Sequence, residues 1–267
     1  MKIKRAYKII VGSVLLVAYI IATGIFVKNK YEELLCKSLN IEIDNNYAFV
    51  SKDVVLDMLA DEGVVIDSTV KVSELNFARI ESLINRNVYV EETQVFGDFK
   101  GNIFLEIKQR DPIVRVMTED SASFYLDGNM KVMPLCNYYT ADMLVLSGHL
   151  KSECFYASDT VDNYNVNNDK NSLNIDDICK FVKYLQSDEL WRNQITQVYV
   201  TASNEVELVP RVGNHIILLG GLDDYETKMN KLEAMYYEGF DITGWGIYSL
   251  INLKYNDQVI CKRRNNG

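Results

Sequence analysis

The longest apolar run in the chain lies near its start, where residues 9–27 contain no charged side chain. At about 1.5 Å of rise per residue, a helix of this length reaches roughly 28 Å, close to the hydrocarbon thickness of a bilayer. The pattern predicts a transmembrane helix over 9–27 after a tail at 1–8. A cleaved signal peptide is the alternative, because Ala22 and Gly24 suit a processing site, but the run exceeds the usual apolar core of such signals.

Basic residues are unevenly distributed around this run. Those that precede it are Lys2, Lys4, Arg5 and Lys8. Lys28 and Lys30 follow it, but Glu32 and Glu33 come soon after them. Because cytoplasmic flanks carry the excess of Lys and Arg, we expect the N-terminus inside the cell and the rest of the chain outside. Residues 28–40 are predicted to continue the helix as a stem.

Beyond the stem, the period of the apolar positions changes twice. The expected elements are a strand at 41–43, a helix from the cap candidate Ser51 to Gly63, a helix from the cap candidate Ser73 to Asn85, and strands at 88–97 and 103–107. This β-α-α-β-β order predicts a small domain over 41–111, in which two helices cover one face of a three-stranded sheet.

A second domain is predicted over 112–264, followed by a tail at 265–267. Pro112 marks its beginning, since proline cannot donate to a ladder and biases Asp111 away from helix. Its expected elements are a hairpin at 123–132, a strand at 143–146, a polar loop at 158–172, helices at 174–185 and 225–237, strands at 195–200, 205–209 and 215–219, and a closing hairpin at 248–262. The predicted fold class is α+β: the membrane helix, the β-α-α-β-β domain, then a mixed β-sheet domain with two or more helices.

Composition narrows the possible partners and cofactors. The formal net charge is −9, and the basic clusters lie at the two ends of the chain, so nucleic-acid binding is disfavoured. The five cysteines form no CxxC or Cys/His ligand spacing, which argues against a structural zinc site. We expect them to be mostly small buried residues rather than a disulfide framework.

No catalytic motif stands out. His149 and His215 are the only histidines, and neither lies in a recognisable nucleophile motif. Gly220 and Gly221 lack the Lys-Ser/Thr of a phosphate loop, and we expect a turn between a strand and a helix. The sequence predicts no enzymatic activity, no cofactor and no metal site.

The order of motifs resembles a known bacterial family. The second strand of the first domain begins Asn-Val-Tyr-Val-Glu-Glu at 87–92, and the third leaves through Ile-Lys-Gln-Arg-Asp-Pro-Ile-Val at 107–114. Both are similar to a POTRA domain of the FtsQ/DivIB cell-division family, which also has a short basic tail, one anchor and a β-rich second module. The closing hairpin resembles that family's last strands, although Asn252 and Lys254 replace its usual Asp and Arg.

The resemblance implies a non-enzymatic scaffold of the division septum in the bacterial inner membrane. Such a protein links early and late division proteins and regulates septal cell-wall synthesis by holding FtsB- and FtsL-like partners outside the membrane. The POTRA domain and the membrane segment would contact other division proteins, and the C-terminal strands would bind FtsB and FtsL by strand addition. The predicted partner-binding residues are Trp245, Tyr248, Leu250, Asn252, Lys254, Gln258, Ile260 and Lys262.

The residues alone support part of this hypothesis. The closing hairpin ends the chain, so its last strand is a candidate sheet edge that accepts another strand. The basic run from Lys262 to Arg264 would attract an acidic partner, although a solvated tail on a covered edge is the plainer interpretation. Two other classes stay open: a POTRA-containing component of polypeptide export or outer-membrane assembly, which predicts several POTRA copies or a barrel, and an anchored hydrolase with an unrecognised site.

Overall fold

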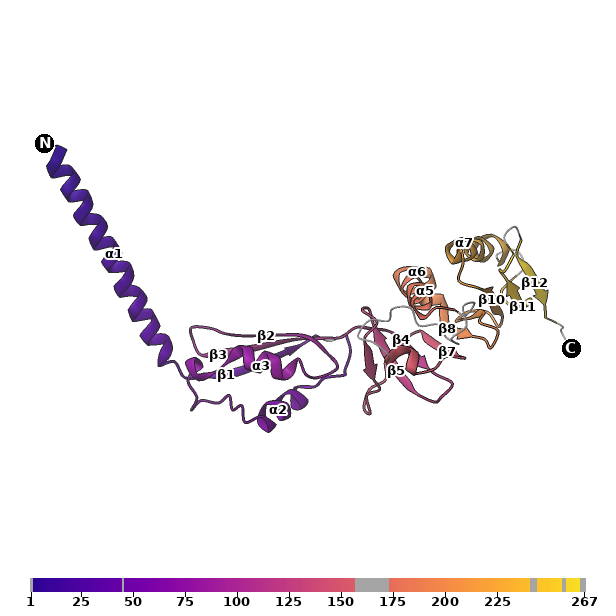
Figure 1. Cartoon of the computed structure of the whole chain (residues 1–267), viewed down its shortest axis with the longest axis horizontal. Helices are drawn as coiled ribbons and strands as arrows, with labels where there is room; N and C mark the ends of the chain where they lie inside the picture. The colour runs from indigo at the N-terminus through magenta and orange to yellow at the C-terminus, as the bar shows by residue number, and fades with distance from the viewer. Residues whose placement is uncertain (1, 45, 157–172, 241–243, 256–257, 265–267) are drawn as a thin grey trace. The chain divides into compact units, whose positions relative to one another are not determined.

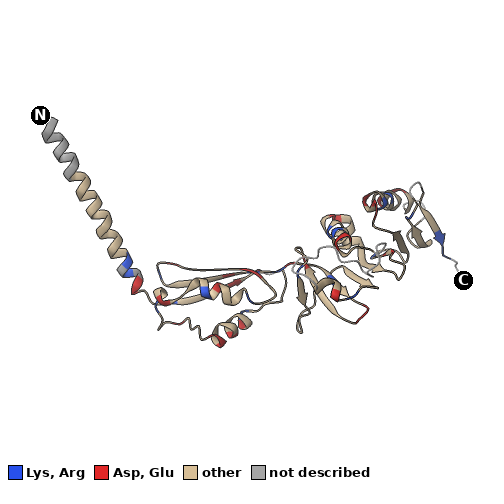
Figure 2. Ribbon diagram, in the orientation of Figure 1, with Lys and Arg blue, Asp and Glu red and all other residues tan. Residues whose placement is uncertain are grey.

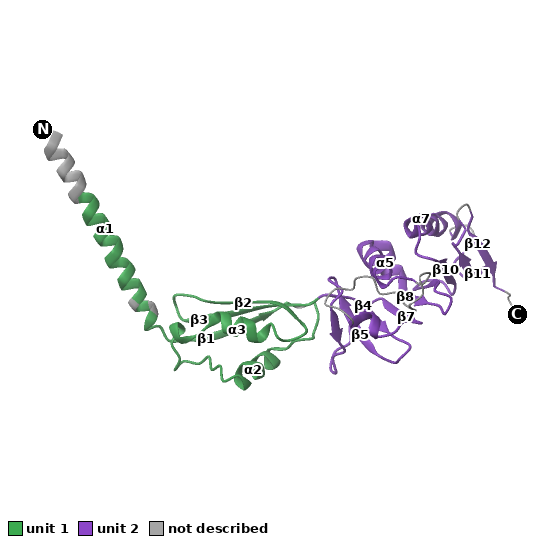
Figure 3. Ribbon diagram, viewed as in Figure 1, with its two compact units in different colours: residues 1–110 green, residues 111–267 purple. Residues whose placement is uncertain are grey.

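The computed structural model describes residues 2–44, 46–156, 173–240, 244–255 and 258–264. The predicted polar loop at 158–172, the turn at 256–257 and the tail at 265–267 lie outside these residues. The chain forms two compact units, Met1–Arg110 and Asp111–Gly267 (Figure 3).

Unit 1 begins with one long helix, α1 (Lys2–Glu32) (Figure 1). The predicted helical stem is wrong beyond Glu32, because the chain turns away there to pair with the rest of the unit. The Cys36 N–H donates to the Val70 carbonyl at 2.9 Å, and strand β1 begins at Ser38.

Within the residues for which a structure is described, no helix combines the length and the apolar character that crossing a membrane requires.

A three-stranded sheet forms the rest of unit 1, with the predicted order of elements. Its elements are β1 (Ser38–Ile43), α2 (Lys52–Asp61), the short 3₁₀ helix η1 (Val72–Glu74), α3 (Phe77–Ile84), β2 (Val90–Gly97) and β3 (Asn102–Gln109). The central strand β3 pairs parallel with β1 and antiparallel with β2. Buried and exposed residues alternate along β3, so one face of the sheet carries the core and the other meets solvent.

Helix caps in unit 1 agree with the sequence at one site and correct it at another. The Ser51 hydroxyl accepts the Val54 N–H at 3.3 Å, which confirms the first predicted cap. Ser73 does not cap α3, because it lies within η1 and its hydroxyl donates to the Glu32 carbonyl at 3.1 Å. Asn76 caps α3 instead, accepting the Arg79 N–H at 3.0 Å.

Unit 2 is built around a nine-stranded mixed sheet. Its strands are β4 (Pro112–Met117), β5 (Ser123–Asp127), β6 (Val132–Pro134), β7 (Val145–Gly148), β8 (Ile195–Val200), β9 (Val206–Pro210), β10 (Ile216–Gly220), β11 (Tyr248–Asn252) and β12 (Ile260–Arg263). They lie in the order β12-β11-β10-β9-β8-β7-β4-β5-β6. The predicted α+β class is confirmed at this level: a large mixed sheet with several helices.

Helices pack on the core face of this sheet. They are α4 (Glu153–Tyr156), α5 (Ile175–Ser187), α6 (Glu189–Gln194), α7 (Tyr225–Ala234) and the π-helical turn η2 (Met235–Gly239). Asn174 caps α5 by accepting the Asp176 N–H at 2.9 Å. Helix α6 was not among the predicted elements, and Asp188 caps its first turn. Its Trp191 is buried in the same core as Phe181 of α5.

Candidate functional site

Strand β12 ends the nine-stranded sheet, and its neighbour β11 is the only strand among the described residues that pairs with it (Figure 1). This arrangement confirms the expectation that the last strand lies at a sheet edge. An edge strand presents a row of backbone groups to which another chain can add a strand. We refer to β11 and β12 together as the C-terminal edge.

The two faces of the C-terminal edge differ in character. Ile251 is fully buried on the core face, and its partner Cys261 packs beside Met235, with sulfur atoms 3.8 Å apart. The opposite face carries Leu250 paired with Lys262, and Asn252 paired with Ile260. Ile216 of β10 pairs with Leu250 from the other side, so Ile216, Leu250 and Lys262 form one row across three strands.

A β-bulge lies in β11, and the backbone groups of β12 point alternately toward β11 and toward the open edge. The register shifts between Tyr248 and Leu250, and the intervening Ser249 hydroxyl donates to the Lys262 carbonyl at 3.3 Å. The Arg264 N–H donates to the Ile247 carbonyl at 2.8 Å, toward β11. Because backbone groups alternate along a strand, those of Cys261 and Arg263 face the open edge.

The two aromatic residues of the predicted partner-binding set pack against other rings of the same unit. The Trp245 ring lies 4.7 Å from the ring of Phe240 and 4.9 Å from that of Tyr236. Tyr248 stacks on Phe240 at 6.1 Å. These rings form a cluster beneath the start of β11, so Trp245 and Tyr248 hold the edge in place from within.

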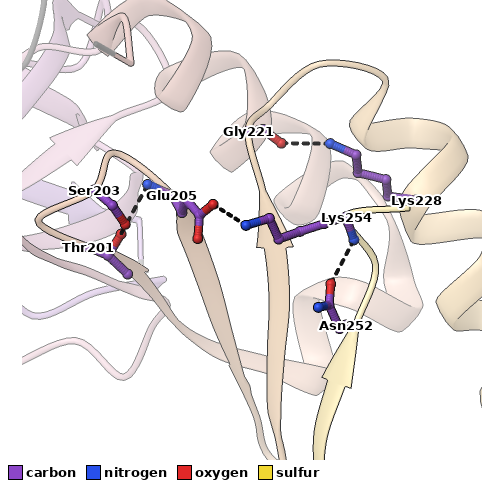
Figure 4. A network of polar contacts seen from close by, with 7 residues as sticks. All are labelled: Thr201, Ser203, Glu205, Gly221, Lys228, Asn252 and Lys254. Atoms are coloured by element: carbon purple, nitrogen blue, oxygen red, sulfur yellow. Dashed lines mark hydrogen bonds and ion pairs between the residues drawn. The ribbon is translucent and has the colours of Figure 1, made fainter. Parts of the chain in front are cut away.

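Lys254 is held across the end of the sheet by a polar network (Figure 4). Its ammonium group forms an ion pair with Glu205, the residue before β9, which raises the Lys254 pKa. The Asn252 side chain accepts the Lys254 N–H at 3.0 Å, and Thr201 in turn accepts the Glu205 N–H. At Gly220 (φ +78°), a Cβ would lie 2.7 Å from the Lys254 side chain, so glycine leaves room for this crossing.

A second lysine near this network is buried, and sequence reasoning missed it. The Lys228 side chain is 5% exposed, and its ammonium donates to the Gly221 carbonyl at 2.9 Å (Figure 4). Asp223 lies 3.4 Å from the same nitrogen. The pair Gly220–Gly221 is therefore a strand-to-helix turn, as predicted, whose carbonyl is used by α7.

The remaining predicted residues lie on the accessible part of the C-terminal edge. Gln258, Ile260 and Lys262 are exposed, and Leu250 is half-buried. Arg263 is exposed beside them and was not in the predicted set. Its outward backbone follows from the same alternation along β12 that turns Cys261 outward. Figure 2 shows the basic end of β12.

Two potentially reactive side chains of unit 2, those of His215 and Cys179, are buried. Burial and the nearby Arg264 lower the pKa of His215 to about 4, and its Nε2 lies 3.2 Å from the Tyr236 hydroxyl. Burial raises the Cys179 pKa to about 12, which disfavours the thiolate. Across the described part of the chain, no three His, Cys, Asp or Glu side chains gather as a possible metal site. The geometry suits binding at an edge.

The second unit is similar to a known protein family. Residues 111–262, which include β11 and all of β12 except Arg263, match the family model described as FtsQ/DivIB, C-terminal related. No curated protein matches the chain.

Proposed function

Because the chain belongs to the FtsQ/DivIB, C-terminal related family, a family of cell-division proteins, we propose that it is a non-enzymatic scaffold of the division machinery. The scaffold holds FtsB- and FtsL-like partners outside the cytoplasm and thereby regulates septal cell-wall synthesis. The observation that carries this proposal is that the matched segment ends on an open strand, β12.

We propose strand addition at β12 as the mode of binding. The outward backbone groups of Cys261 and Arg263 supply the ladder, and the exposed Ile260 and Lys262 side chains read alternate positions of the added strand. Lys262 and Arg263 favour an acidic partner and disfavour pairing of β12 with a second copy of itself. Lys254 acts indirectly in this scheme, because its ion pair with Glu205 orders the end of β11.

The domain assignment is part of the same proposal. Residues 41–111 form the POTRA domain, supported by the β-α-α-β-β order and the parallel pairing of β1 with β3. Residues 112–264 form the β-domain. The POTRA domain serves recruitment to the division site and contacts other division proteins.

A membrane anchor in α1 completes the proposed scaffold. From Val14 to Val27 the large apolar side chains of this helix are all exposed. A helix that is apolar on all sides requires an apolar environment. With the basic residues before it, α1 would place the N-terminus in the cytoplasm and both units outside the bacterial inner membrane.

Binding of residues 31–267 to FtsB- and FtsL-like ectodomains from the same cell tests the scaffold. Two variants at one position separate backbone pairing from charge. Arg263→Ala removes the charge and keeps the N–H, whereas Arg263→Pro removes both. We expect Arg263→Ala to weaken binding a few-fold in a salt-dependent way and Arg263→Pro to weaken it at least tenfold more.

The fold of each variant is checked by tryptophan fluorescence, since both tryptophans lie in unit 2. Equal affinities for the two variants would remove strand addition from the proposal. An intact protein that binds neither partner would contradict the scaffold itself.

A further inference from the structure

The turn between β2 and β3 packs directly against the segment that leaves α1 (Figure 1). The Lys37 N–H donates to the Gly101 carbonyl at 2.7 Å. Gly101 has φ +90°, and a Cβ on it would lie 2.3 Å from the Leu35 carbonyl oxygen. Only glycine allows this approach of one backbone to another.

Further contacts hold the end of α1 to the same part of unit 1. The Val72 N–H donates to the Leu34 carbonyl at 2.8 Å, and the backbones of Leu35 and Lys71 form an isolated antiparallel β-bridge. The Ser73 hydroxyl donates to Glu32, the last residue of the helix. Residues 33–37, 71–74 and 98–101 together form what we call the α1-proximal end.

The turn itself is stiffened by one carboxylate. Asp98 accepts the Lys100 N–H at 2.8 Å, the Asn102 N–H at 2.9 Å and the Asn102 side-chain amide at 2.7 Å. These hydrogen bonds lower the Asp98 pKa, so the carboxylate stays charged at neutral pH. The backbone conformation of the turn is therefore preset.

The stiff turn presents an aromatic side chain to the outside. Phe99 is 82% exposed, the largest exposed fraction among the large hydrophobic side chains that the structure describes. Exposing a phenylalanine to water forgoes the favourable transfer of its apolar surface. A rigid turn that displays one suggests an apolar surface to receive it.

Lysines flank this aromatic tip. Lys100 follows it directly, and Lys37 lies against Gly101, with its Cγ 3.5 Å from the position of a Cβ there. Two exposed glutamates, Glu33 and Glu74, lie at the same end. The Asp98 carboxylate accepts hydrogen bonds from N–H groups of the turn. An aromatic ring bordered by lysines is typical of a contact with the headgroup layer of a membrane.

The position of the tip along α1 agrees with such a contact. Glu32, the end of the helix, lies five positions after Val27, the end of the apolar run. At about 1.5 Å per residue they span roughly 8 Å. The headgroup layer on each side of a bilayer is about 5–8 Å thick, so the α1-proximal end falls at its outer boundary.

We propose that the β2–β3 turn is a membrane-interface contact: Phe99 enters the headgroup layer of the bilayer that holds α1, and Lys37 and Lys100 lie against lipid phosphates. This contact sets the orientation of unit 1 on the membrane. The proposal rests on the anchor described under Proposed function.

Photo-crosslinking of the full chain in liposomes tests it. Benzoyl-phenylalanine is placed at Phe99, and the crosslinked peptide is identified by mass spectrometry after digestion. Leu56 on α2 and Tyr237 in unit 2 are control positions with exposed side chains. We expect lipid adducts at position 99 at least fivefold above both controls in liposomes of phosphatidylglycerol and phosphatidylcholine.

Two further arms make the result decisive. A variant with Lys37→Gln and Lys100→Gln should give a several-fold lower adduct yield, and so should the wild-type chain in liposomes of phosphatidylcholine alone. An unchanged yield overturns the role of the lysines. A chain that resists carbonate extraction but gives no adduct above the controls overturns the contact alone. A chain that carbonate releases overturns the anchor and, with it, the proposed membrane location.

Discussion

His215 is a buried titratable residue inside an aromatic cluster of unit 2. It is 2% exposed, its Nε2 lies 3.2 Å from the Tyr236 hydroxyl, and its Nδ1 has no hydrogen-bond partner among the described residues. The ring packs against Phe240, 5.6 Å away. Protonation would place a charge inside this aromatic cluster, next to the chain segment that carries β11.

We therefore predict that acid weakens unit 2 through His215. Its folded pKa is lowered to about 4 from an ordinary value near 6.5, so the unfolded chain binds the proton more readily. The stability that neutral His215 contributes is fully present above about pH 6.5 and is lost as the pH falls through about 4. The loss is on the order of 3 kcal/mol at the acid end of this window.

Urea unfolding followed by tryptophan fluorescence at pH 7, 5.5 and 4.5 measures this effect. His215→Gln should flatten the dependence of unfolding free energy on pH. His149→Gln is the matched control, because His149 is half-exposed beside Glu119, at 3.3 Å. Parallel pH profiles for wild type and His215→Gln would contradict the prediction.

At the scale of elements, one side chain joins the loop after β1 to the end of β3. The buried amide of Gln109 accepts the Val50 N–H at 2.9 Å. Its nitrogen donates to the carbonyls of Asp44 at 2.8 Å and Tyr47 at 2.7 Å. The Gln109 side chain thereby supplies hydrogen bonds to backbone groups of the loop.

Gln109→Leu is expected to destabilise unit 1 by about 2–3 kcal/mol, because the buried Val50 N–H loses its acceptor and the two carbonyls lose this donor. Far-UV circular dichroism follows the change. Gln94→Leu on the exposed side of β2 is the matched control and should shift the transition by less than about 0.5 kcal/mol. Equal transitions for the two variants would show that the loop is held by other contacts.

At the scale of the whole molecule, the two units have separate cores. Phe49, Leu59 and Ile84 are buried in unit 1. A separate cluster around Phe181, Trp191 and Leu208 lies entirely within unit 2. Both tryptophans of the chain belong to unit 2, so their fluorescence reports on that unit alone.

Separate cores predict separate unfolding. Urea titration should give a tryptophan transition that does not coincide with the circular dichroism transition of residues 31–267. Gln109→Leu should move the circular dichroism curve and leave the tryptophan midpoint unchanged. Superimposable curves in both proteins would mean that the units unfold as one.

Much of the architecture could be predicted because its signals are local. Ser51 and Asn174 cap helices through N–H groups two or three residues away, and strand β3 alternates within eight residues. The same local reasoning failed at Ser73, since its hydroxyl is taken by Glu32, 41 positions earlier. Capping competes with long-range contacts that a sequence pattern does not contain.

By itself, the sequence determined the order of most elements, the α+β class and the position of the closing hairpin, because periodicity and turn chemistry act over a few neighbouring residues. The tertiary structure alone decided which predicted residues are accessible. Lys254 forms an ion pair with Glu205, 49 positions away, and β12 pairs only with β11 among the described strands, which leaves its other side open. Both depend on pairing between distant strands, and the free energy of such pairing is a property of the folded sheet rather than of any local segment.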